Sequence, residues 1–330
     1  MEEFKAIELQ QARDFSKKMN VTFEFLRQNF KALIRAILYI AGPPVLVGSL
    51  LIGSFMSDFF SLTLASQTSG NPEAAANYFL SVNFWLQLIL MIILLFASYI
   101  ITLACINSYI ILYKEKLTNK IEVKEVWNRV RQLFGPYLGT TILFFLAFIL
   151  VYIFLLIPVF IFGSLSSVLV AFVGIPVVIC GLAYLAISSS LTFFIQAYER
   201  KNFFDSLARS FRLVNNGKWW STFGLILILQ LITGTVSYIF LIPYYVIVFT
   251  ASLHTAQTGS PFEFSETMSI IILVCFTLYY MAQMLLYSLP NTGIAFQYFN
   301  LVELKEARGL MSQIETLGQN DSAPRPEEHF

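Results

Sequence analysis

Apolar side chains dominate six long stretches of the chain, each interrupted only by neutral polar residues. The stretches are residues 36–57, 84–113, 137–163, 165–198, 219–251 and 268–300. A helix that rises 1.5 Å per residue needs about 20 residues to cross a hydrocarbon core of about 30 Å, and every stretch is long enough. None shows the alternating pattern of a barrel strand. The sequence therefore predicts an all-α, polytopic integral membrane bundle of six transmembrane helices.

Composition supports a membrane protein and excludes several other classes. Hydrophobic residues make up 57% of the 330 residues and charged residues 12%, whereas a soluble domain has about 25% charged residues. The net charge of +1 gives no general attraction to nucleic acid. The three cysteines all lie inside apolar stretches, so we expect no disulfide framework. The charged N-terminal residues lack the features of a cleaved signal peptide, so we expect the first apolar stretch to remain as a span.

The basic residues predict the orientation of these helices. Seven lie in residues 1–35, six in 114–136, five in 199–218 and three after residue 300, whereas the loops at 58–83, 164 and 252–267 have none. Basic loops stay on the cytoplasmic side of a membrane. We therefore expect both termini and the two basic loops to be cytoplasmic, and six spans keep all of these segments on one side.

Each of the first three basic segments also has the periodicity of an amphipathic helix. The predicted apolar faces are Phe23, Leu26, Phe30, Leu33 and Ile34; Val123, Val126, Trp127, Val130 and Phe134; and Phe204, Leu207, Phe211 and Val214. Such helices lie in the membrane interface with basic residues toward anionic headgroups; the alternative is a solvated helix packed on protein. The candidate headgroup and interface residues are Arg27, Lys31, Arg129, Arg131, Arg209, Arg212, Trp219 and Trp220.

An internal repeat follows from this arrangement. Units 22–115, 122–200 and 203–303 each contain an amphipathic segment, an outward span and a return span, and VYIFLLIP at 151–158 resembles SYIFLIP at 237–243. Chance similarity of apolar spans is the alternative explanation. Three parallel pseudo-repeats about an axis along the membrane normal are expected. We predict a cytoplasmic segment at 1–20, a compact membrane domain at 21–303 and a cytoplasmic tail at 304–330 with a disordered end.

Two segments resemble a known family. The stretch AYERKNFFDSLARSFRLVNNGKWWSTFGLILIL at 197–229 and the closing FQYFNLVELKEARGLMSQIETLG at 296–318 resemble the six-span membrane domain found in some glycerophosphodiester phosphodiesterases. They are similar also to related bacterial inner-membrane proteins of unknown function. The resemblance covers roughly 20–318 and implies a fold and a location in the bacterial cytoplasmic (inner) membrane. Because no hydrolase domain accompanies it, the resemblance implies no phosphodiesterase activity.

Candidate catalytic chemistry is sparse. The only histidines are His254 and His329, and the spans contain no Asp, Glu, Lys or Arg near their centres, so we predict no metal centre, no cofactor and no proton relay. An outer-face metal hydrolase would have only a few groups available: Asp58, Glu73, Glu263, Glu266 and His254. The sequence favours a protein that is not an enzyme.

Neutral polar residues remain inside the spans. Asn107, Thr192 and Thr292 each lie six residues before the tyrosine near the end of a return span. They form a candidate axial cluster that lines a cavity, or they are hydrogen-bonding contacts between helices. The sequence thus favours a multi-pass protein that binds membrane lipids, including anionic ones, or scaffolds other membrane proteins. Its expected partners are these lipids and either another membrane protein or further copies of the chain in a homo-oligomer. A transporter for a small or amphipathic molecule is the alternative, and an enzyme acting on lipid headgroups is a weaker third class.

Overall fold

The fold is all-α, as predicted. A computed structural model describes residues 6–69, 77–165, 167–259, 262, 265–307 and 311, and no residue in these ranges lies in a strand. Six helical segments of the described chain are long and apolar enough to cross a membrane: Gly42–Thr63, Val82–Lys116, Val123–Ile161, Phe172–Glu199, Trp219–Thr258 and Glu266–Glu306. Each corresponds to one of the six predicted spans, with ends shifted by a few residues in most cases. The chain is therefore compatible with a multi-pass membrane protein.

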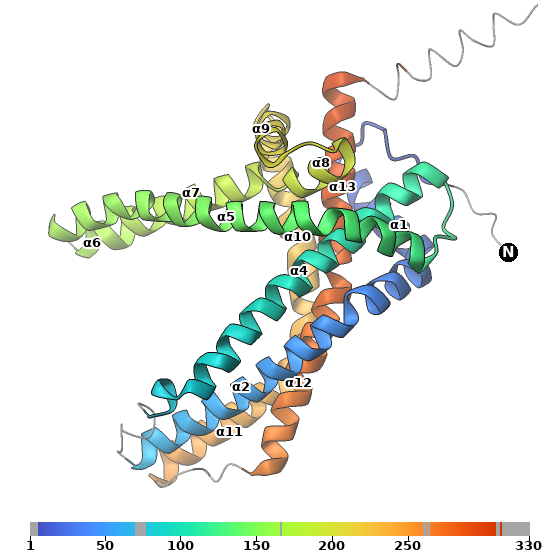
Figure 1. The fold of residues 1–330 in the computed structure, drawn as a ribbon. Coiled ribbons are helices and arrows are strands. Elements are labelled where there is room, and N and C mark those ends of the chain that lie inside the picture. Colours follow the sequence, from blue (N-terminus) through green and yellow to red (C-terminus); the bar gives the residue numbers. More distant parts are fainter. Residues whose placement is uncertain are drawn as a thin grey trace, which may run out of the picture.

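The helices follow one another with short connections (Figure 1). They are α1 (Phe15–Ile40), α2 (Gly42–Ser69), α4 (Val82–Lys116), α5 (Val123–Leu165), α6 (Ser167–Leu169), α7 (Ile175–Ser188), α8 (Thr192–Glu199), α9 (Phe203–Val214), α10 (Trp219–Tyr238), α11 (Ile242–Thr258), α12 (Glu266–Leu286) and α13 (Ser288–Glu306). A π-helical turn at Val170–Gly174 precedes α7. A 3₁₀ turn at Ile239–Leu241 separates α10 from α11 just before Pro243, which cannot donate a backbone hydrogen bond.

Local sequence explains where several helices begin and end. Ser81, Asn202 and Ser265 each accept a backbone N–H of the following helix's first turn, the usual role of an N-cap. The last helix of each predicted unit ends in a left-handed residue, with φ of 52° at Leu117 after α4, 54° at Arg200 after α8 and 47° at Ala307 after α13. These caps turn the chain sharply toward the next connection.

The amphipathic segments differ from expectation in two ways. The third is a separate helix, α9, but the second has no boundary with its span and forms the beginning of the continuous α5. In α1, Phe23 and Phe30 of the predicted apolar face are exposed, whereas Leu33 of that face is buried in the protein together with Phe25. In α9, Arg209 of the predicted basic face is buried, whereas Arg212 of that face and Phe204 of the apolar face are exposed. Exposed phenylalanines suit a surface that faces lipid.

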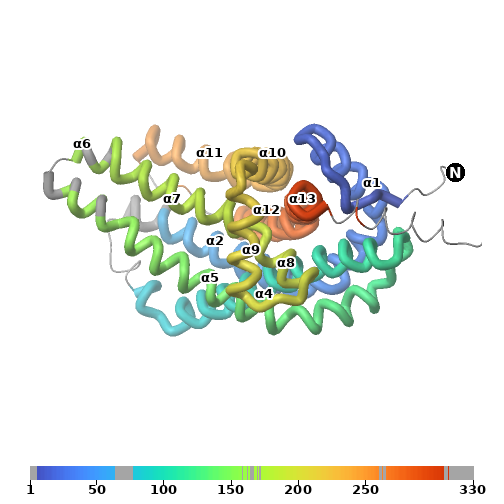
Figure 2. The backbone as a smooth tube through the Cα atoms, turned by 90° about the horizontal axis from the view of Figure 1, so that it is seen from above, coloured from blue at the N-terminus to red at the C-terminus, as the bar shows by residue number. Residues whose placement is uncertain are grey.

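The principal core lies at the end of the molecule where the return helices finish. It joins α1 to the C-terminal half of α4, to α8 and to α13, which lie side by side in Figure 2. Its largest fully buried side chains include Phe25, Tyr109, Tyr113, Phe194 and Tyr298. The N-terminal segment joins this core, because Ile7 is buried and its N–H donates to the Tyr113 hydroxyl at 2.8 Å. The expected boundary at residue 20 falls inside α1, and the tail predicted to be disordered lies largely outside the described residues.

Two arms extend from this core, in place of the single compact bundle expected. In Figure 1 the green α5 and α7 form one arm, and α2, α4, α11 and α12 form the other, which diverges from it. Among the described helices, the most extensive pairing is between α2 and α12, within the second arm. Apolar side chains such as Phe154 and Phe160 on the first arm are exposed. The arms therefore present apolar surface that a membrane would cover.

Candidate functional site

A stripe of basic side chains follows the outer side of α1. Arg27, Lys31 and Arg35 are exposed and spaced four residues apart, so they share one side of the helix. Lys120, in the connection between α4 and α5, lies across a groove from them. In the described part of the chain, no carboxylate pairs with any of these four cations. We call this feature the α1 groove, after α1 on one of its sides. Its lining residues are Arg27, Gln28, Phe30, Lys31, Ala32, Arg35, Asn119, Lys120, Ile121, Glu122 and Val123.

The position of the connection makes the groove. Asn119 donates its side-chain N–H to the Gln28 carbonyl at 3.4 Å, which ties the connection to α1. Ile121 is buried against the core, and Glu122 lines the far end of the groove. Phe30, 58% exposed, lies beside the cations. The groove thus combines positive charge with an apolar side chain at its edge.

The predicted headgroup residues of the second amphipathic segment, Arg129 and Arg131, contact other side chains of the protein. Arg129 makes a two-pronged pair with Glu115, with N–O distances of 3.0 and 2.8 Å. Arg131 lies over the Trp127 ring, 5.0 Å from its centroid. A guanidinium held by a carboxylate in this way is a weaker ligand for a second anion. These contacts do not favour the predicted headgroup role for Arg129.

Arg209 belongs to a buried ionic network rather than to a surface. Its side chain is 7% exposed and lies 2.5 Å from Glu199 and 2.9 Å from Glu306. Glu199 also accepts the Tyr298 hydroxyl at 2.5 Å. Burial disfavours the charged guanidinium, but the hydrogen bond and charge of Glu199 outweigh it and raise the pKa of Arg209. The network joins α8, α9 and α13, so the placement favours a structural role for Arg209.

The remaining predicted interface residues lie at the start of α10 and the end of α9. Arg212 is exposed, and Lys305 donates to its carbonyl. Trp219 stacks on Tyr184 and Phe223, whereas Trp220 is exposed. An exposed tryptophan at a helix start suits a membrane interface.

The three residues of the predicted axial cluster are buried but do not bond to one another. Asn107 donates to the Tyr137 hydroxyl at 2.8 Å, and the Thr192 hydroxyl donates to the Ser189 carbonyl at 2.7 Å. Thr292 has a buried hydroxyl without a partner among the described residues. Asn107 lines a cavity of about 370 Å³ between the arms, with Asn291 and Ser190, but Thr192 and Thr292 do not line it. For Asn107, the geometry matches the alternative of a contact between helices.

Sequence reasoning missed a buried lysine. Lys18 is 2% exposed, and its ammonium donates to Gln297 Oε1 at 2.6 Å and to Ser221 Oγ at 2.9 Å. Burial, followed by the charge of Lys218, lowers the pKa of Lys18 to about 8, and Asp14 opposes this. The helical spacing of the sequence could have indicated it, because Lys18 falls on the buried side of α1. That side carries Lys18, Thr22, Phe25, Asn29 and Leu33. The neighbouring Lys17 in a charged segment concealed it.

The described chain shows no metal site, and the comparisons with known proteins assign it no family. Within the described residues, no group of three or more His, Cys, Asp or Glu side chains is placed to hold a metal ion. Comparison of the chain with protein-family models, with curated proteins and with solved structures finds no match. The resemblance to the phosphodiesterase-associated membrane domain therefore stays a prediction.

Proposed function

We propose that this multi-pass membrane protein binds anionic lipid headgroups in the α1 groove and has no catalytic activity of its own. The observation that carries the proposal is the set of four cations, Arg27, Lys31, Arg35 and Lys120, that face one groove without carboxylate partners in the described chain. Guanidinium and ammonium groups are the usual protein ligands of phosphate. Each basic residue near an anionic leaflet contributes about 1 kcal/mol to association.

The groove also has the amphipathic character that an interfacial lipid site needs. Phe23 and Phe30 are exposed on the same side of α1 as Arg27. Phenylalanine at this depth packs on acyl chains while the cations remain at headgroup level. Since basic segments stay in the cytoplasm, the groove faces the cytoplasmic leaflet, which the family resemblance places in a bacterial inner membrane.

A three-repeat architecture would place the three basic segments on one side of the membrane. In each proposed unit, a polar side-chain contact joins the returning part of the chain to an earlier helix, which is α1 in the first unit, α5 in the second and α10 in the third. The Tyr109 hydroxyl donates to Asn29 Oδ1 at 3.0 Å between α1 and α4, the Thr140 hydroxyl donates to Gln196 Oε1 at 2.9 Å between α5 and α8, and the Gln297 amide donates to Thr222 Oγ1 at 2.7 Å between α10 and α13. The first contact uses the amphipathic helix and the other two use the outward spans, so the three contacts are similar in kind but not equivalent in position.

The competing functions receive less support from the geometry. Coupled transport would need an ionisable group on a pathway, and Lys18 lines neither the cavity between the arms nor the α1 groove. Scaffolding of a membrane-protein partner, or self-association, would use the exposed apolar arms, which lipid also covers. Lipid binding therefore remains the function that a specific set of residues favours.

The experiment is a lipid-retention assay on the double variant Arg27→Gln/Lys31→Gln. Native mass spectrometry of protein released from nanodiscs would compare retained phosphatidylglycerol with retained phosphatidylcholine. Loss of two cations, at about 1 kcal/mol each, should weaken phosphatidylglycerol retention about thirtyfold and leave phosphatidylcholine retention unchanged. Lys17→Gln, which removes an exposed cation outside the groove that pairs with Asp14, is the control and should retain lipid as the parent does. Equal retention by the double variant and the parent would refute the proposal.

A further inference from the structure

The cavity of about 370 Å³ between the arms has the size and position of a binding site in the membrane. Its walls come from α4, α5, α7, α8, α10 and α13. None of its sixteen lining side chains is charged, and all lie within the candidate membrane spans. Its volume is within the usual range for a small-molecule site, about 300–1,000 Å³.

Two of the spans are interrupted beside this cavity. The span Phe172–Glu199 breaks between α7 and α8, and Ser189 and Ser190 of the break line the cavity. The span Glu266–Glu306 breaks at Tyr287, between α12 and α13, and Tyr287 lines the cavity as well. Non-helical backbone at membrane depth is tolerated where it is buried in protein or lines a cavity, and transporters bind substrates at such discontinuous helices. The coincidence of two breaks with one cavity therefore points to a binding site.

The cavity opens at the surface between the arms. Tyr99, on the second arm, is 40% exposed, and Ala186, on the first arm, is also exposed, so these two residues border the opening. Asn107 and Asn291 are 2% and 5% exposed and line the buried part of the cavity. A molecule that enters from the lipid would thus bring its polar group to the asparagines and keep its apolar part at the opening.

The hydroxyl groups of the lining use their donors within the protein. Thr141, Ser189 and Ser190 each donate to a backbone carbonyl three or four residues earlier, at 2.8 Å. Each hydroxyl oxygen can still accept a hydrogen bond.

The two asparagines also direct an amide N–H into the protein. Asn107 donates to the Tyr137 hydroxyl at 2.8 Å, and Asn291 donates to the Tyr287 carbonyl at 2.7 Å. Within the described chain, no donor is bonded to the side-chain carbonyl oxygen of either asparagine. A carbonyl oxygen can only accept a hydrogen bond. The lining therefore offers mainly acceptors, and its complement is a ligand that donates hydrogen bonds.

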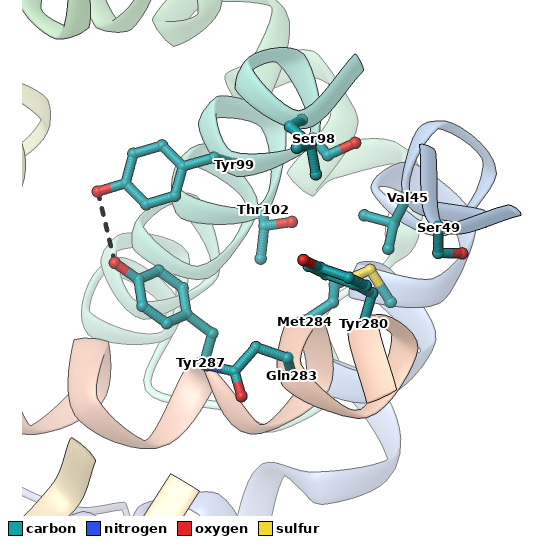
Figure 3. A pocket seen from close by; sticks show the side chains of 10 residues that line it. Val45, Ser49, Ser98, Tyr99, Thr102, Tyr280, Gln283, Met284 and Tyr287 are labelled. Atoms are coloured by element: carbon teal, nitrogen blue, oxygen red, sulfur yellow. Dashed lines mark hydrogen bonds between the residues drawn. The ribbon is translucent and has the colours of Figure 1, made fainter. Parts of the chain in front are cut away.

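Tyr99 and Tyr287 separate this cavity from a smaller one. Both side chains line both cavities, and their hydroxyl oxygens lie 3.4 Å apart at the edge of the smaller cavity (Figure 3). The smaller cavity, between α2, α4 and α12, holds about 230 Å³ and has no charged side chain in its lining. Since a charged ligand would meet no counter-ion in either cavity, the site suits an uncharged molecule.

From this geometry we propose that the cavity between the arms binds an uncharged lipid with hydroxyl groups on its headgroup, such as a monoacylglycerol. The hydroxyls donate to acceptor oxygens of the lining, and the acyl chain leaves through the opening at Tyr99 and Ala186. A single hydrogen bond to either asparagine is enough for a preference for the hydroxylated headgroup. The site shares no residue with the α1 groove and takes an uncharged ligand, so failure of one proposal leaves the other intact.

The test measures saturable binding of 1-monodecanoylglycerol to the full chain, by native mass spectrometry of protein released from phosphatidylcholine nanodiscs. Propyl decanoate, which has the same carbon skeleton without the two hydroxyls, serves as the comparison ligand. The parent should bind monodecanoylglycerol one to one and about tenfold more tightly than propyl decanoate, because the ester has no donor for the lining. Equal affinity for the two ligands, or no saturable binding, would overturn the proposal.

Variants locate the binding within the molecule. Ala186→Trp places a large side chain at the opening and should weaken monodecanoylglycerol binding about tenfold or more. Ile179→Trp, on the same helix at a position that is 60% exposed and does not line the cavity, is the control and should bind as the parent does. Binding by Ala186→Trp with the affinity of the parent would contradict the proposed site.

A second variant tests the headgroup contact. Asn291→Leu keeps a side chain of similar size but removes its acceptor oxygen, so the preference for monodecanoylglycerol over propyl decanoate should fall. Because Asn291 also contacts the Tyr287 carbonyl, the melting temperature of this variant in detergent is compared with that of the parent. Should the variant unfold, Ala186→Trp decides alone. An unchanged preference in a folded Asn291→Leu protein would contradict a headgroup contact at this asparagine.

Discussion

At the scale of single residues, Lys18 is held in an environment that disfavours its charge. Its ammonium contacts the neutral oxygens of Gln297 and Ser221, and no carboxylate among the described residues pairs with it. Asp14, one turn earlier, favours the charge but is outweighed by burial and by Lys218. The lysine nevertheless orders three helices, since its partners lie on α13 and α10. Such an arrangement predicts a defined dependence of stability on pH.

The pH dependence follows from the lowered pKa of Lys18. The pKa falls from 10.5 to about 8 on folding, so between these values the unfolded chain binds more protons and stability rises with pH. Below about pH 8 both states are protonated and the cost of burying the charge is fully present. The melting temperature of the parent in detergent should rise from pH 8 to pH 10 relative to that of Lys18→Met, which has no such titration. The corresponding gain in the free energy of unfolding is at most about 3 kcal/mol.

Lys17 provides the control for this measurement. Its side chain is 73% exposed and pairs with Asp14 at 3.7 Å, so Lys17→Met should leave the pH profile of the parent unchanged. A Lys18→Met variant whose melting temperature follows the same profile as the parent would mean that the lysine titrates no differently in the folded chain.

At the scale of helices, the backbones of α2 and α12 approach closely within the second arm, which α2, α4, α11 and α12 form. A Cβ atom at Gly53 of α2 would lie 2.8 Å from the Leu273 Cα and 2.9 Å from its carbonyl oxygen on α12. Membrane helices associate through such small residues, because lipid provides no hydrophobic drive between them. The glycine therefore sets the spacing of α2 and α12, which form two walls of a cavity of about 230 Å³.

Substitution of this glycine tests the packing. Gly53→Ala should force α2 from α12 and lower the melting temperature in detergent. Gly139 of α5 has no atom within 4 Å of an added Cβ, so Gly139→Ala should be neutral or stabilising by about 0.5–1 kcal/mol, the usual gain for alanine in a helix interior. If Gly53→Ala were as stable as Gly139→Ala, the close contact between α2 and α12 would not exist in the membrane-embedded protein.

The helices themselves could be predicted from sequence, but their buried faces could not. A run of apolar residues specifies a span by length alone, which is why six segments were identified correctly. In α1 and α9, however, apolar residues serve two environments, lipid for Phe30 and Phe204 and protein for Phe25 and Leu213. An analysis of helical periodicity counts both groups simply as apolar and does not distinguish lipid-facing from protein-facing side chains. The same limitation concealed the roles of Arg209 and Lys18, whose partners lie on helices distant in sequence.

At the scale of the whole molecule, charge and packing divide the structure in the same way. The basic connections and the principal core share one end, whereas the tips of the two arms end in loops without Lys or Arg (Figure 1). The divergence of the arms was not predictable, because a lipid-facing helix and a protein-facing helix have similar compositions. The cavity of about 370 Å³ lies in the fork between the arms.

The distribution of charge predicts a sidedness that labelling can measure. Asn119 follows two spans, Asn216 follows four, and His254 lies near the end of the fifth. In a chain whose three cysteines, Cys105, Cys180 and Cys275, have been replaced, Asn119→Cys and Asn216→Cys should react with a membrane-impermeant maleimide only in inside-out vesicles. His254→Cys should react only in right-side-out vesicles, because an odd number of crossings separates it from the others. Reaction of His254→Cys on the same side as Asn119→Cys would mean that the α10–α11 segment does not cross, and the basic segments would then no longer share one face of the membrane.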